Sequence, residues 1–348
     1  MEKIESLPIF FIIGRPRTGT TLIRTLFDAH PNVNIPPECP IILNLFPKYG
    51  GIINWDQKNL IAFYKDVQKQ RKFISWQIDL EKLKIELLEC EGETTFQHLI
   101  KLLYGNNNSL FDKDDIVTLG DKNPVYSIYI KKIFKAFPDA KYIHLTRDYR
   151  DNILSILKVD FEAPIVPLIA YRWRYSAINI LRIKKKYPAQ FFTIKYEDFV
   201  NKSRDHYKKL CEFVGVPFDD NVFDFYKKKD EIYKLYPSKI LDKYHKSLFQ
   251  PISNKKVGLW KKEMKEKDIK AAEAVIGKYA EMLGYERKYK RPSLWTTIRI
   301  LPGITYGRLS YVFGFFVNLL PFRLRMAIIN RGSILAGMYW KVYSLFKK

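Results

Sequence analysis

One segment of the chain carries two glycines at a spacing that suits a phosphate-binding turn. Residues 14–21 read Gly-Arg-Pro-Arg-Thr-Gly-Thr-Thr, and they follow an apolar run at residues 9–13. Gly14 and Gly19 have the spacing of a P-loop, in which backbone N–H groups and the N-terminus of the next helix face an anion. A tight turn with surface arginines could contain the same glycines, but strand, loop, hydroxyl pair and helix start occur here in register. We therefore interpret residues 14–21 as a phosphate cradle.

The cradle differs from an ATP-binding loop in the position of its charge. A lysine is expected directly after the second glycine, where it reaches the β- and γ-phosphates, but this chain has Thr20 there. Arg15 and Arg17 instead place cations inside the loop, and Thr20 and Thr21 add two hydroxyls. Because arginine forms bidentate, charge-assisted contacts with phosphate oxygens, this set suits one phosphate and a transferable group without a loop-bound metal.

Two further polar clusters directly follow predicted strands. Asp121-Lys122-Asn123-Pro124 comes after one apolar run, and Arg147-Asp148 comes after another. In an open α/β sheet the carboxyl ends of the strands form the edge at which ligands bind. Ser155 follows Arg147 by eight residues, which is about two turns along the helix predicted next. On its own, an arginine followed by a serine at this spacing does not indicate a particular ligand.

Strands and helices alternate along most of the chain, and this pattern is the basis for the predicted fold. Apolar runs of strand length predict strands, and apolar residues at intervals of three and four predict helices. Strands are predicted at residues 9–13, 116–120, 141–146 and 191–195, and helices at residues 20–29, 151–157, 167–186, 203–214 and 267–283, with one more ending at residue 134. Such alternation is typical of a parallel sheet. We therefore expect an α/β fold with a P-loop-type central parallel β-sheet flanked by helices.

Composition indicates a globular protein with an uneven positive charge. The 348 residues are 47% hydrophobic, which is ample for a core, and the formal net charge is +23. Residues 287–348 contain twelve Lys or Arg and no Asp or Glu. Cys39, Cys90 and Cys211 are too few and too scattered for a disulfide framework or a metal-ligand set, so we expect no metal site.

At four short places the chain resembles the sulfotransferases that use 3′-phosphoadenosine 5′-phosphosulfate (PAPS). The resemblance rests on the cradle, on Asp28-Ala29-His30-Pro31, on Arg147 with Ser155, and on Val257-Gly258-Leu259-Trp260-Lys261. It covers roughly residues 8–290, and the segment up to Glu38 is most similar to the tyrosylprotein sulfotransferase branch and its bacterial relatives.

The resemblance implies a binding site for PAPS. The cradle would hold the 5′-phosphosulfate, Arg147 and Ser155 the 3′-phosphate, and Tyr196 would lie near the adenine. The Arg-Lys-Gly clamp of the family aligns with Ser253-Asn254-Lys255, followed by Lys256, so a basic loop remains while the contacting side chain is left open. The implied binding residues are Arg15, Arg17, Thr18, Gly19, Thr20, Thr21, Arg147, Ser155, Tyr196, Lys255 and Lys256.

In-line sulfonate transfer needs cations at the leaving phosphate oxygen and a base at the acceptor oxygen. The resemblance assigns Arg17 and Lys122 to the leaving side, because Asp121-Lys122-Asn123-Pro124 resembles the Asn-Lys-Asp-Pro segment of the tyrosylprotein branch. It assigns the base to Glu38, which follows a rigid proline pair and returns toward the cradle. A glutamate base would work best in a partly desolvated pocket that raises its pKa. Many relatives use a histidine instead, and the candidates are His98 and His144.

Residues 293–348 lie outside the resemblance, and we expect them to form a helical tail appended to a sulfotransferase domain at residues 1–292. The apolar run at residues 311–320 is too short to cross a bilayer, and the longer run at residues 326–346 carries basic residues. Amphipathic helices in the membrane interface, with cations toward anionic lipid, are therefore favoured. Packing on the core of the protein or in a dimer is the alternative.

These observations predict a PAPS-dependent sulfotransferase whose acceptor is a hydroxyl of a small, hydrophobic molecule such as a sterol or lipid. A carbohydrate hydroxyl is the alternative, and peptide tyrosine is less favoured, because we expect a cytoplasmic protein, peripheral on the inner face of the membrane, without a secretion signal. A P-loop kinase or NTPase would need the missing lysine. A basic nucleic-acid-binding protein would need a recognition motif, and none is evident in the sequence.

Overall fold

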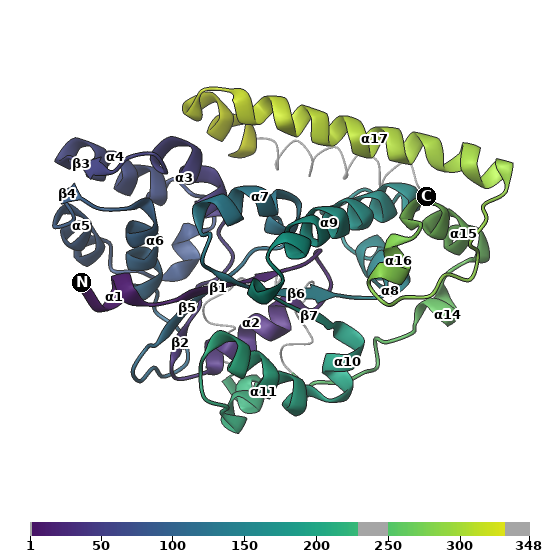
Figure 1. The fold of residues 1–348 in the computed structure, drawn as a ribbon, viewed down its shortest axis with the longest axis horizontal. Helices are drawn as coiled ribbons and strands as arrows, with labels where there is room; N and C mark the ends of the chain where they lie inside the picture. The colour runs from purple at the N-terminus through teal and green to yellow at the C-terminus, as the bar shows by residue number, and fades with distance from the viewer. Residues whose placement is uncertain (1, 229–249, 331–348) are drawn as a thin grey trace. The chain divides into compact units, whose positions relative to one another are not determined.

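The computed structural model of the protein describes residues 2–228 and 250–330 (Figure 1). The chain divides into two compact units. The first unit comprises Met1–Thr146 and Asn179–Asn254, and the second comprises Arg147–Ile178 and Lys255–Lys348.

The first unit is built on a five-stranded parallel sheet with the strand order β2-β5-β1-β6-β7. Its strands are β1 (Ile9–Ile13), β2 (Val33–Asn34), β5 (Thr118–Lys122), β6 (Lys141–Thr146) and β7 (Phe191–Lys195). Parallel neighbours need crossover connections, and helices supply them here. The prediction of an α/β fold with a central parallel sheet is confirmed.

Strand β1 occupies the centre of this sheet and is buried along its whole length. Phe11 stacks on Tyr142 of the neighbouring strand with ring centroids 5.4 Å apart, and Phe10 packs on Phe27 of α2 at 4.8 Å. Close packing of large rings on both sides fixes the strand and the helix that follows it. The loop between β1 and α2 is therefore held at both ends.

Helices cover both faces of the sheet, with α2 and α11 on one side and α7 on the other (Figure 1). The helices and short elements of this unit are α1 (Glu2–Ser6), α2 (Thr20–Ala29), α3 (Ile41–Tyr49), α4 (Gln57–Gln68), η1 (Phe73–Trp76), α5 (Leu80–Leu88), α6 (Phe96–Gly105), α7 (Tyr126–Ala136), η2 (Pro188–Gln190), α10 (Tyr196–Asn201), α11 (Ser203–Val214) and η3 (Asp220–Lys228). A separate two-stranded antiparallel sheet joins β3 (Asn54–Trp55) and β4 (Gly92–Glu93).

Strand β5 lies two residues further along the chain than predicted. The sequence predicts a strand ending at Gly120 with a polar exit after it, but the strand continues through Lys122. Asp121 and Lys122 are each 2% exposed, and each has a buried or half-buried partner, Tyr104 for the carboxylate and Glu38 for the ammonium. Polar residues can belong to a buried strand when their side chains are paired, and this pairing is not visible in hydropathy.

The second unit is helical. It contains α8 (Tyr149–Leu157), the part of α9 (Val166–Lys186) up to Ile178, α14 (Trp260–Glu263), α15 (Glu266–Ile276), α16 (Tyr279–Met282) and α17 (Leu294–Leu319). A buried carboxylate, Glu273, accepts hydrogen bonds from the Tyr149 hydroxyl (3.0 Å) and the Arg150 guanidinium (3.3 Å). Helix α8 begins two residues earlier than predicted, because Asp148 caps it by accepting from the Arg150 N–H at 2.9 Å.

Two expectations for the end of the chain are corrected. The helix predicted at residues 267–283 is two helices, α15 and α16, separated at Gly277, whose φ of 58° a helix interior does not accommodate. The apolar run at residues 311–320 belongs to α17, a continuous helix of 26 residues with Pro302 inside it. Within residues 2–228 and 250–330, it is the one helix that is long and apolar enough to cross a membrane by length and composition.

Part of the predicted tail lies outside the described residues. The apolar run predicted at residues 326–346 is described only as far as residue 330.

Candidate active site

The loop between β1 and α2 has the backbone geometry of an anion-binding turn. Gly19 is the N-cap of α2 with a φ of 98°, and a Cβ there would fall 2.6 Å from Cδ2 of Tyr196. A Cβ at Gly14 would collide with the carbonyl oxygen of Leu145 on β6. Both positions therefore require glycine. No side chain caps α2, so the free N–H groups and positive dipole end of a ten-residue helix remain available to an anion.

The polar residues of the cradle lie in and beside this turn. Arg15 is buried, and its carbonyl accepts from the Thr18 hydroxyl at 2.7 Å, which tightens the loop. Arg17 is half-buried and has a φ of 70°, a left-handed conformation that costs a non-glycine residue about 1 kcal/mol or more. Thr20 is buried at the helix start. A strained arginine at a helix N-terminus points to a functional rather than a packing role.

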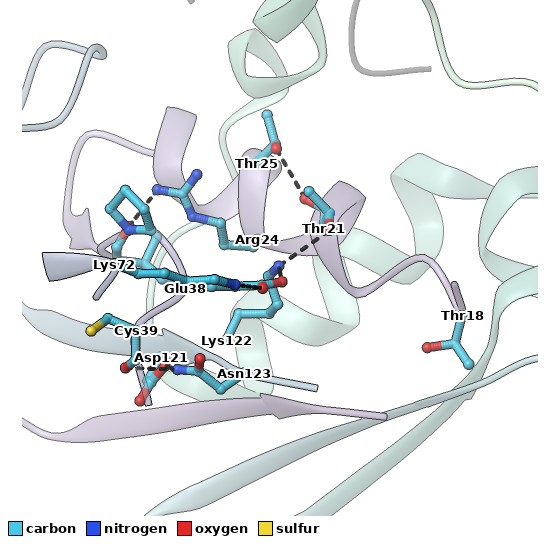
Figure 2. Close-up of polar contacts among 12 residues, drawn as sticks. Thr18, Thr21, Arg24, Thr25, Glu38, Cys39, Lys72, Asp121, Lys122 and Asn123 are labelled. Atoms are coloured by element: carbon cyan, nitrogen blue, oxygen red, sulfur yellow. Dashed lines mark hydrogen bonds and ion pairs between the residues drawn. The ribbon is translucent and has the colours of Figure 1, made fainter. Parts of the chain in front are cut away.

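Lys122 joins the cradle to Glu38. The Lys122 ammonium, at the carboxyl end of β5, donates to the Thr21 hydroxyl at 3.1 Å and forms an ion pair with the Glu38 carboxylate (Figure 2). Lys72, which precedes η1, contacts the other carboxylate oxygen of Glu38 at 3.1 Å. We call these four residues, Thr21, Glu38, Lys72 and Lys122, the Glu38 cluster.

Charge dominates the acid–base behaviour of the Glu38 cluster. Burial by itself would raise the pKa of Glu38, but the charges and hydrogen bonds of Lys122 and Lys72 outweigh it and lower this pKa to about 2. Burial lowers the pKa of Lys122, and the charge of Glu38 opposes that effect. The raised pKa that would best suit a glutamate base is therefore not found at Glu38 in this structure, because Lys72, which the sequence does not reveal at this site, adds its charge to that of Lys122.

The backbone around Glu38 is fixed by side chains from three other elements. The carbonyl of Ile35 accepts from Arg24 of α2 at 2.9 Å, that of Pro37 from the Trp76 indole at 2.8 Å, and that of Cys39 from Asn123 at 3.3 Å. Every second carbonyl group between residues 35 and 39 therefore accepts a hydrogen bond from a side chain elsewhere in the fold. Such anchoring keeps the carboxylate in one position relative to α2 and β5.

Several residues of this arrangement were not predicted from the sequence. Lys72 and Trp76 lie in a region of amphipathic helices without a motif, and they meet residues 37 and 38 only in the folded chain. Asp121 is also part of the support, since burial raises its pKa to about 6 against the hydrogen bond from Tyr104. No sequence signal distinguishes Lys72 and Trp76 from ordinary surface and core positions, whereas Asp121 belongs to the polar cluster that follows a predicted strand.

Tyr196 lies directly against the cradle. It is the first residue of α10, immediately after β7, and its ring edge occupies the space that a side chain at residue 19 would need. The ring is 9% exposed. The structure therefore brings Tyr196 beside the turn.

The residues predicted to hold a second phosphate lie in the second unit. Arg147 is buried and donates from Nη2 to the carbonyl of Lys256 at 2.7 Å, and Ser155 is half-buried on α8. Lys255 and Lys256 are exposed. The contact between Arg147 and the carbonyl of Lys256 fixes the backbone of the basic loop. The position of that backbone sets where the side chains of Lys255 and Lys256 begin.

Asp151 of α8 holds the segment that follows the basic loop. Its carboxylate accepts from the N–H of Gly258 at 2.6 Å and from the N–H of Trp260 at 2.9 Å. The Trp260 ring in turn lies under the Arg150 guanidinium, 3.7 Å from its centroid. The sequence predicts Asp151 only as a helix residue, so its role as an anchor for residues 257–261 was missed.

The two alternative bases lie elsewhere. His144 is in the middle of the sheet on β6, and burial lowers its pKa to about 3. His98 is buried on α6, 3.5 Å from Glu5, and burial lowers its pKa as well. Neither histidine contacts Glu38 or Lys122 in the structure. Among residues 2–228 and 250–330, no group of three or more His, Cys, Asp or Glu side chains forms a metal-binding cluster.

In the first unit, the central strand of a parallel α/β sheet ends in a glycine turn at a helix N-terminus, beside an anchored lysine–carboxylate pair. This arrangement is typical of α/β proteins that bind an anionic ligand at the carboxyl edge of the sheet. A family model described as "Sulfotransferase family" matches residues 8–220. Because this match covers more than half of the chain, the protein belongs to the sulfotransferase family.

Curated relatives share low identity over much of the chain. A protein-tyrosine sulfotransferase of Drosophila melanogaster is 21% identical over 306 residues, which are 84% of this chain and 55% of that protein. The omega-hydroxy-beta-dihydromenaquinone-9 sulfotransferase Stf3 of Mycobacterium tuberculosis is 21% identical over 259 residues, which are 62% of this chain and 64% of that protein. The chain spans about half the length of the Drosophila melanogaster and Caenorhabditis elegans tyrosine sulfotransferases that it matches, and 27% of an uncharacterized Aquifex aeolicus protein.

Solved structures support the fold. The sulfotransferase domain of the olefin synthase from Synechococcus PCC 7002 superposes with a TM-score of 0.56 at 20% identity, covering 80% of this chain and 95% of that domain. The sulfotransferase domain from the curacin biosynthetic pathway gives a TM-score of 0.50 at 20% identity, covering 80% and 98%. At these identities the likeness concerns the fold.

Proposed function

We propose that the protein transfers a sulfonate group from PAPS to a hydroxyl of a small, hydrophobic acceptor, such as a sterol or lipid. The Glu38 cluster carries this proposal, because it places a carboxylate and a buried ammonium together at the N-terminus of α2. A sulfonate donor brings negative charge to that helix end, and an acceptor hydroxyl needs a base beside it. Residues 1–292 would form the transferase domain, with residues 293–348 as a tail.

The binding residues suit PAPS by charge and shape. The two glycines of the cradle leave no room for side chains, so the backbone can approach a phosphosulfate, with Arg15, Arg17, Thr18, Gly19, Thr20 and Thr21 around it. In the second unit, Arg147, Ser155, Lys255 and Lys256 offer cations and a hydroxyl for the 3′-phosphate, and Tyr196 of the first unit offers a ring for the adenine. No metal is assigned to the reaction.

The transfer step balances with residues of this chain. A bond forms between the acceptor oxygen and sulfur as the bond between sulfur and the bridging phosphate oxygen breaks. The hydroxyl proton passes to Glu38, and the leaving bisphosphate keeps the electron pair, with Arg17 and Lys122 stabilising its charge. A carboxylate with a pKa of about 2 is a weak base, so Glu38 must lose a lysine contact before it acts.

Lys122 is the lysine whose contact with Glu38 would be lost when the donor binds. It reaches both Thr21 of the cradle and Glu38, so an anion bound at the cradle competes with the carboxylate for the same ammonium. When the ammonium turns toward the bridging oxygen, the pKa of Glu38 rises because one of its two cations is withdrawn. Donor binding would thereby activate the base and place a cation at the leaving group in one movement.

The hydrophobic acceptor is supported by two observations. The name of the mycobacterial relative gives an omega-hydroxy-beta-dihydromenaquinone-9 as its acceptor, which is a lipid. The exposed apolar residues of helix α17 favour work at a membrane surface, where a lipid acceptor would be present. Peptide tyrosine is the second candidate, since the Drosophila relative is named a protein-tyrosine sulfotransferase, and a carbohydrate hydroxyl is the third.

The donor is tested by thermal stabilisation. Adenosine 3′,5′-bisphosphate without Mg²⁺ should raise Tm, since a ligand at about 100 times its Kd adds about 2.7 kcal/mol of stability. A response to Mg-ATP alone would instead indicate a kinase or NTPase.

The acceptor is tested by incubating the protein and PAPS with separated lipid, sugar and peptide fractions of a cell extract. Mass spectrometry should find sulfonated products in the lipid fraction. Products confined to the sugar or peptide fraction would reject the lipid proposal while retaining the sulfotransferase.

A further inference from the structure

Helix α17 is fastened to its own unit along one narrow stripe. The buried positions recur every three or four residues, with one longer interval, as expected for one side of a helix: Ile300, Gly303, Gly307 and Val317. A Cβ on Gly303 would fall 2.8 Å from Cβ of Pro167, and one on Gly307 would enter the Tyr171 ring. Tyr311 stacks on Tyr175 with centroids 4.2 Å apart. These contacts hold α17 against α9 over several turns.

The opposite face of α17 is apolar and exposed. At about 100° per residue, the exposed apolar side chains fall on the side away from the buried stripe. Phe315, which is 61% exposed, lies at the margin of this side, and the other exposed apolar residues are Leu294, Trp295, Ile298, Leu301, Tyr306, Leu309, Val312, Phe313, Phe316 and Leu319. The exposed fraction reaches 81% for Trp295, 64% for Phe313 and 60% for Phe316. We call these ten residues the apolar face of α17.

Positive charge borders the apolar face. Arg299 and Arg308 are exposed and, by the same helical spacing, project from its two edges. The Arg299 guanidinium forms a long ion pair with Asp268 of α15, at 3.9 Å, and Arg308 donates a hydrogen bond to Tyr171 of α9. The sequence from residue 287 to residue 348 has twelve Lys or Arg and no Asp or Glu. Among the described residues, the apolar face is thus bordered by an arginine on each edge, and the sequence of the segment offers them no acidic residue.

We propose that the apolar face of α17 is a docking surface for an anionic lipid bilayer, on which the helix lies in the plane of the membrane. The apolar side chains would enter the boundary between headgroups and acyl chains, and the arginines at the edges would contact lipid phosphates. A contiguous exposed face of this kind marks an interaction site. This inference rests on α17 and its surroundings and does not depend on the sulfotransferase reaction.

A position across the membrane conflicts with the contacts of α17. Gly303, Gly307 and Tyr311 pack on α9, and α17 also contacts α15. Helix α9 carries Arg172, which pairs with Glu162, and Arg174, which donates to the Val275 carbonyl. Inserting α17 into hydrocarbon would either strip these contacts from the stripe or draw the charged helix into the bilayer. Length and composition permit a span, and packing opposes it.

A dimer through the same face is opposed by charge. Two copies of α17 would bring the arginines at the edges of one helix beside those of the other. Asp268 pairs with Arg299 at long range, and residues 287–348 supply no carboxylate for Arg308. Like charges at close range are destabilising, whereas phosphate headgroups neutralise them. The bilayer is therefore the partner that satisfies both the apolar and the charged residues.

Vesicle flotation of the full chain tests this proposal. Binding is compared between phosphatidylcholine vesicles and vesicles with 30 mol% phosphatidylglycerol (about one lipid in three, enough for a strong negative surface potential). The test variant is W295S/F313S/F316S, and the matched control I53S/I74S removes exposed isoleucines elsewhere. We expect binding to anionic vesicles, a loss of at least about tenfold in the triple variant, and no change in the control.

Four results would overturn the proposal: no flotation of the intact protein, equal flotation of the triple variant, retention after an alkaline carbonate wash, or a dimer in solution that the triple variant abolishes. The carbonate result would show a spanning helix and the dimer result self-association. Arg299→Gln should weaken binding and reduce its dependence on salt, because one lipid phosphate contact is lost. Circular dichroism and Tm of the variants show that they remain folded.

Discussion

Replacing Glu38 by Gln separates the role of its charge from the role of its shape. The amide keeps the side-chain length and can still accept from Lys122, while the base and one charge of the ion pair are lost. The carbonyls of residues 35, 37 and 39 keep their partners, so the backbone should not move. The variant therefore tests chemistry with little change in structure.

We expect turnover of the Glu38→Gln variant to fall by about 100- to 10 000-fold, the usual contribution of a general base, while donor affinity changes by less than about threefold. Stability should fall as well. The difference between the ordinary pKa of 4.5 and the value of about 2 for Glu38 corresponds to at most about 3 kcal/mol. Because Lys72 is more than half exposed and screened by water, about 1–2 kcal/mol is expected.

The stability lost in the Glu38→Gln variant should decrease as the pH falls. A carboxylate with a lowered pKa stabilises the folded protein above its ordinary pKa, and that contribution disappears as the pH falls from about 4.5 toward 2. The stability difference between wild type and Glu38→Gln should therefore be constant above pH 5 and shrink below pH 4. Urea unfolding at a series of pH values measures it.

The assays are single-turnover transfer, calorimetric binding of adenosine 3′,5′-bisphosphate, and unfolding. Lys72→Met is the matched control, because it removes a cation from the other carboxylate oxygen without a proposed contact to the leaving group. Loss of donor binding in parallel with turnover in Glu38→Gln would refute the base assignment and give Glu38 a structural role. A stability difference that stays constant down to pH 3 would refute the ion-pair reasoning.

Three further substitutions test the site. Lys122→Met should lower turnover by about 100- to 1000-fold and shift the acidic limb of the pH–rate profile to higher pH, because the pKa of Glu38 rises without its buried cation. An acidic limb at the same pH as in the wild type would contradict the proposed control of the Glu38 pKa by Lys122. Gly19→Ala should cost about 2–3 kcal/mol in urea unfolding, since φ is 98° and the methyl would meet Tyr196; a cost under about 0.5 kcal/mol would mean that the turn relaxes freely. Asp151→Asn loses one of the two N–H contacts that the carboxylate accepts, and it should weaken the binding of adenosine 3′,5′-bisphosphate more than that of adenosine 5′-phosphate. Isothermal calorimetry measures both affinities, and equal weakening would mean that residues 257–261 do not contribute to binding of the 3′-phosphate.

The fold was largely predictable from local patterns. Strands β1, β6 and β7 and helices α2 and α11 occur at the predicted residues, because continuous apolar runs and three-to-four spacing report burial directly. The prediction failed at β5, where the strand includes two charged residues, and at Gly277, where a single residue with positive φ ends a helix pattern. The end of β5 depends on the pairing of its charged side chains, and the break at Gly277 depends on backbone conformation. A hydropathy pattern reports neither property.

The candidate site was predictable only where residues lie close in the sequence. The cradle is one continuous segment, and the proline pair before Glu38 indicates the direction of the returning chain. Lys72 reaches Glu38 across 34 residues, and Asp151 reaches Gly258 across 107. No local pattern encodes such contacts, so the lowered pKa of Glu38 and the anchoring of residues 257–261 required the folded structure.

The short helix η1 links two functions that are usually separate. Lys72 at its start contacts the Glu38 carboxylate, and the indole of Trp76 at its end donates to the carbonyl of Pro37, the residue before Glu38. A displacement of this single turn would therefore alter both the charge beside the carboxylate and the direction in which it points. Residues 72–76 thus form a compact segment for protein engineering, through which acid–base strength can be retuned while the glycine turn stays as it is.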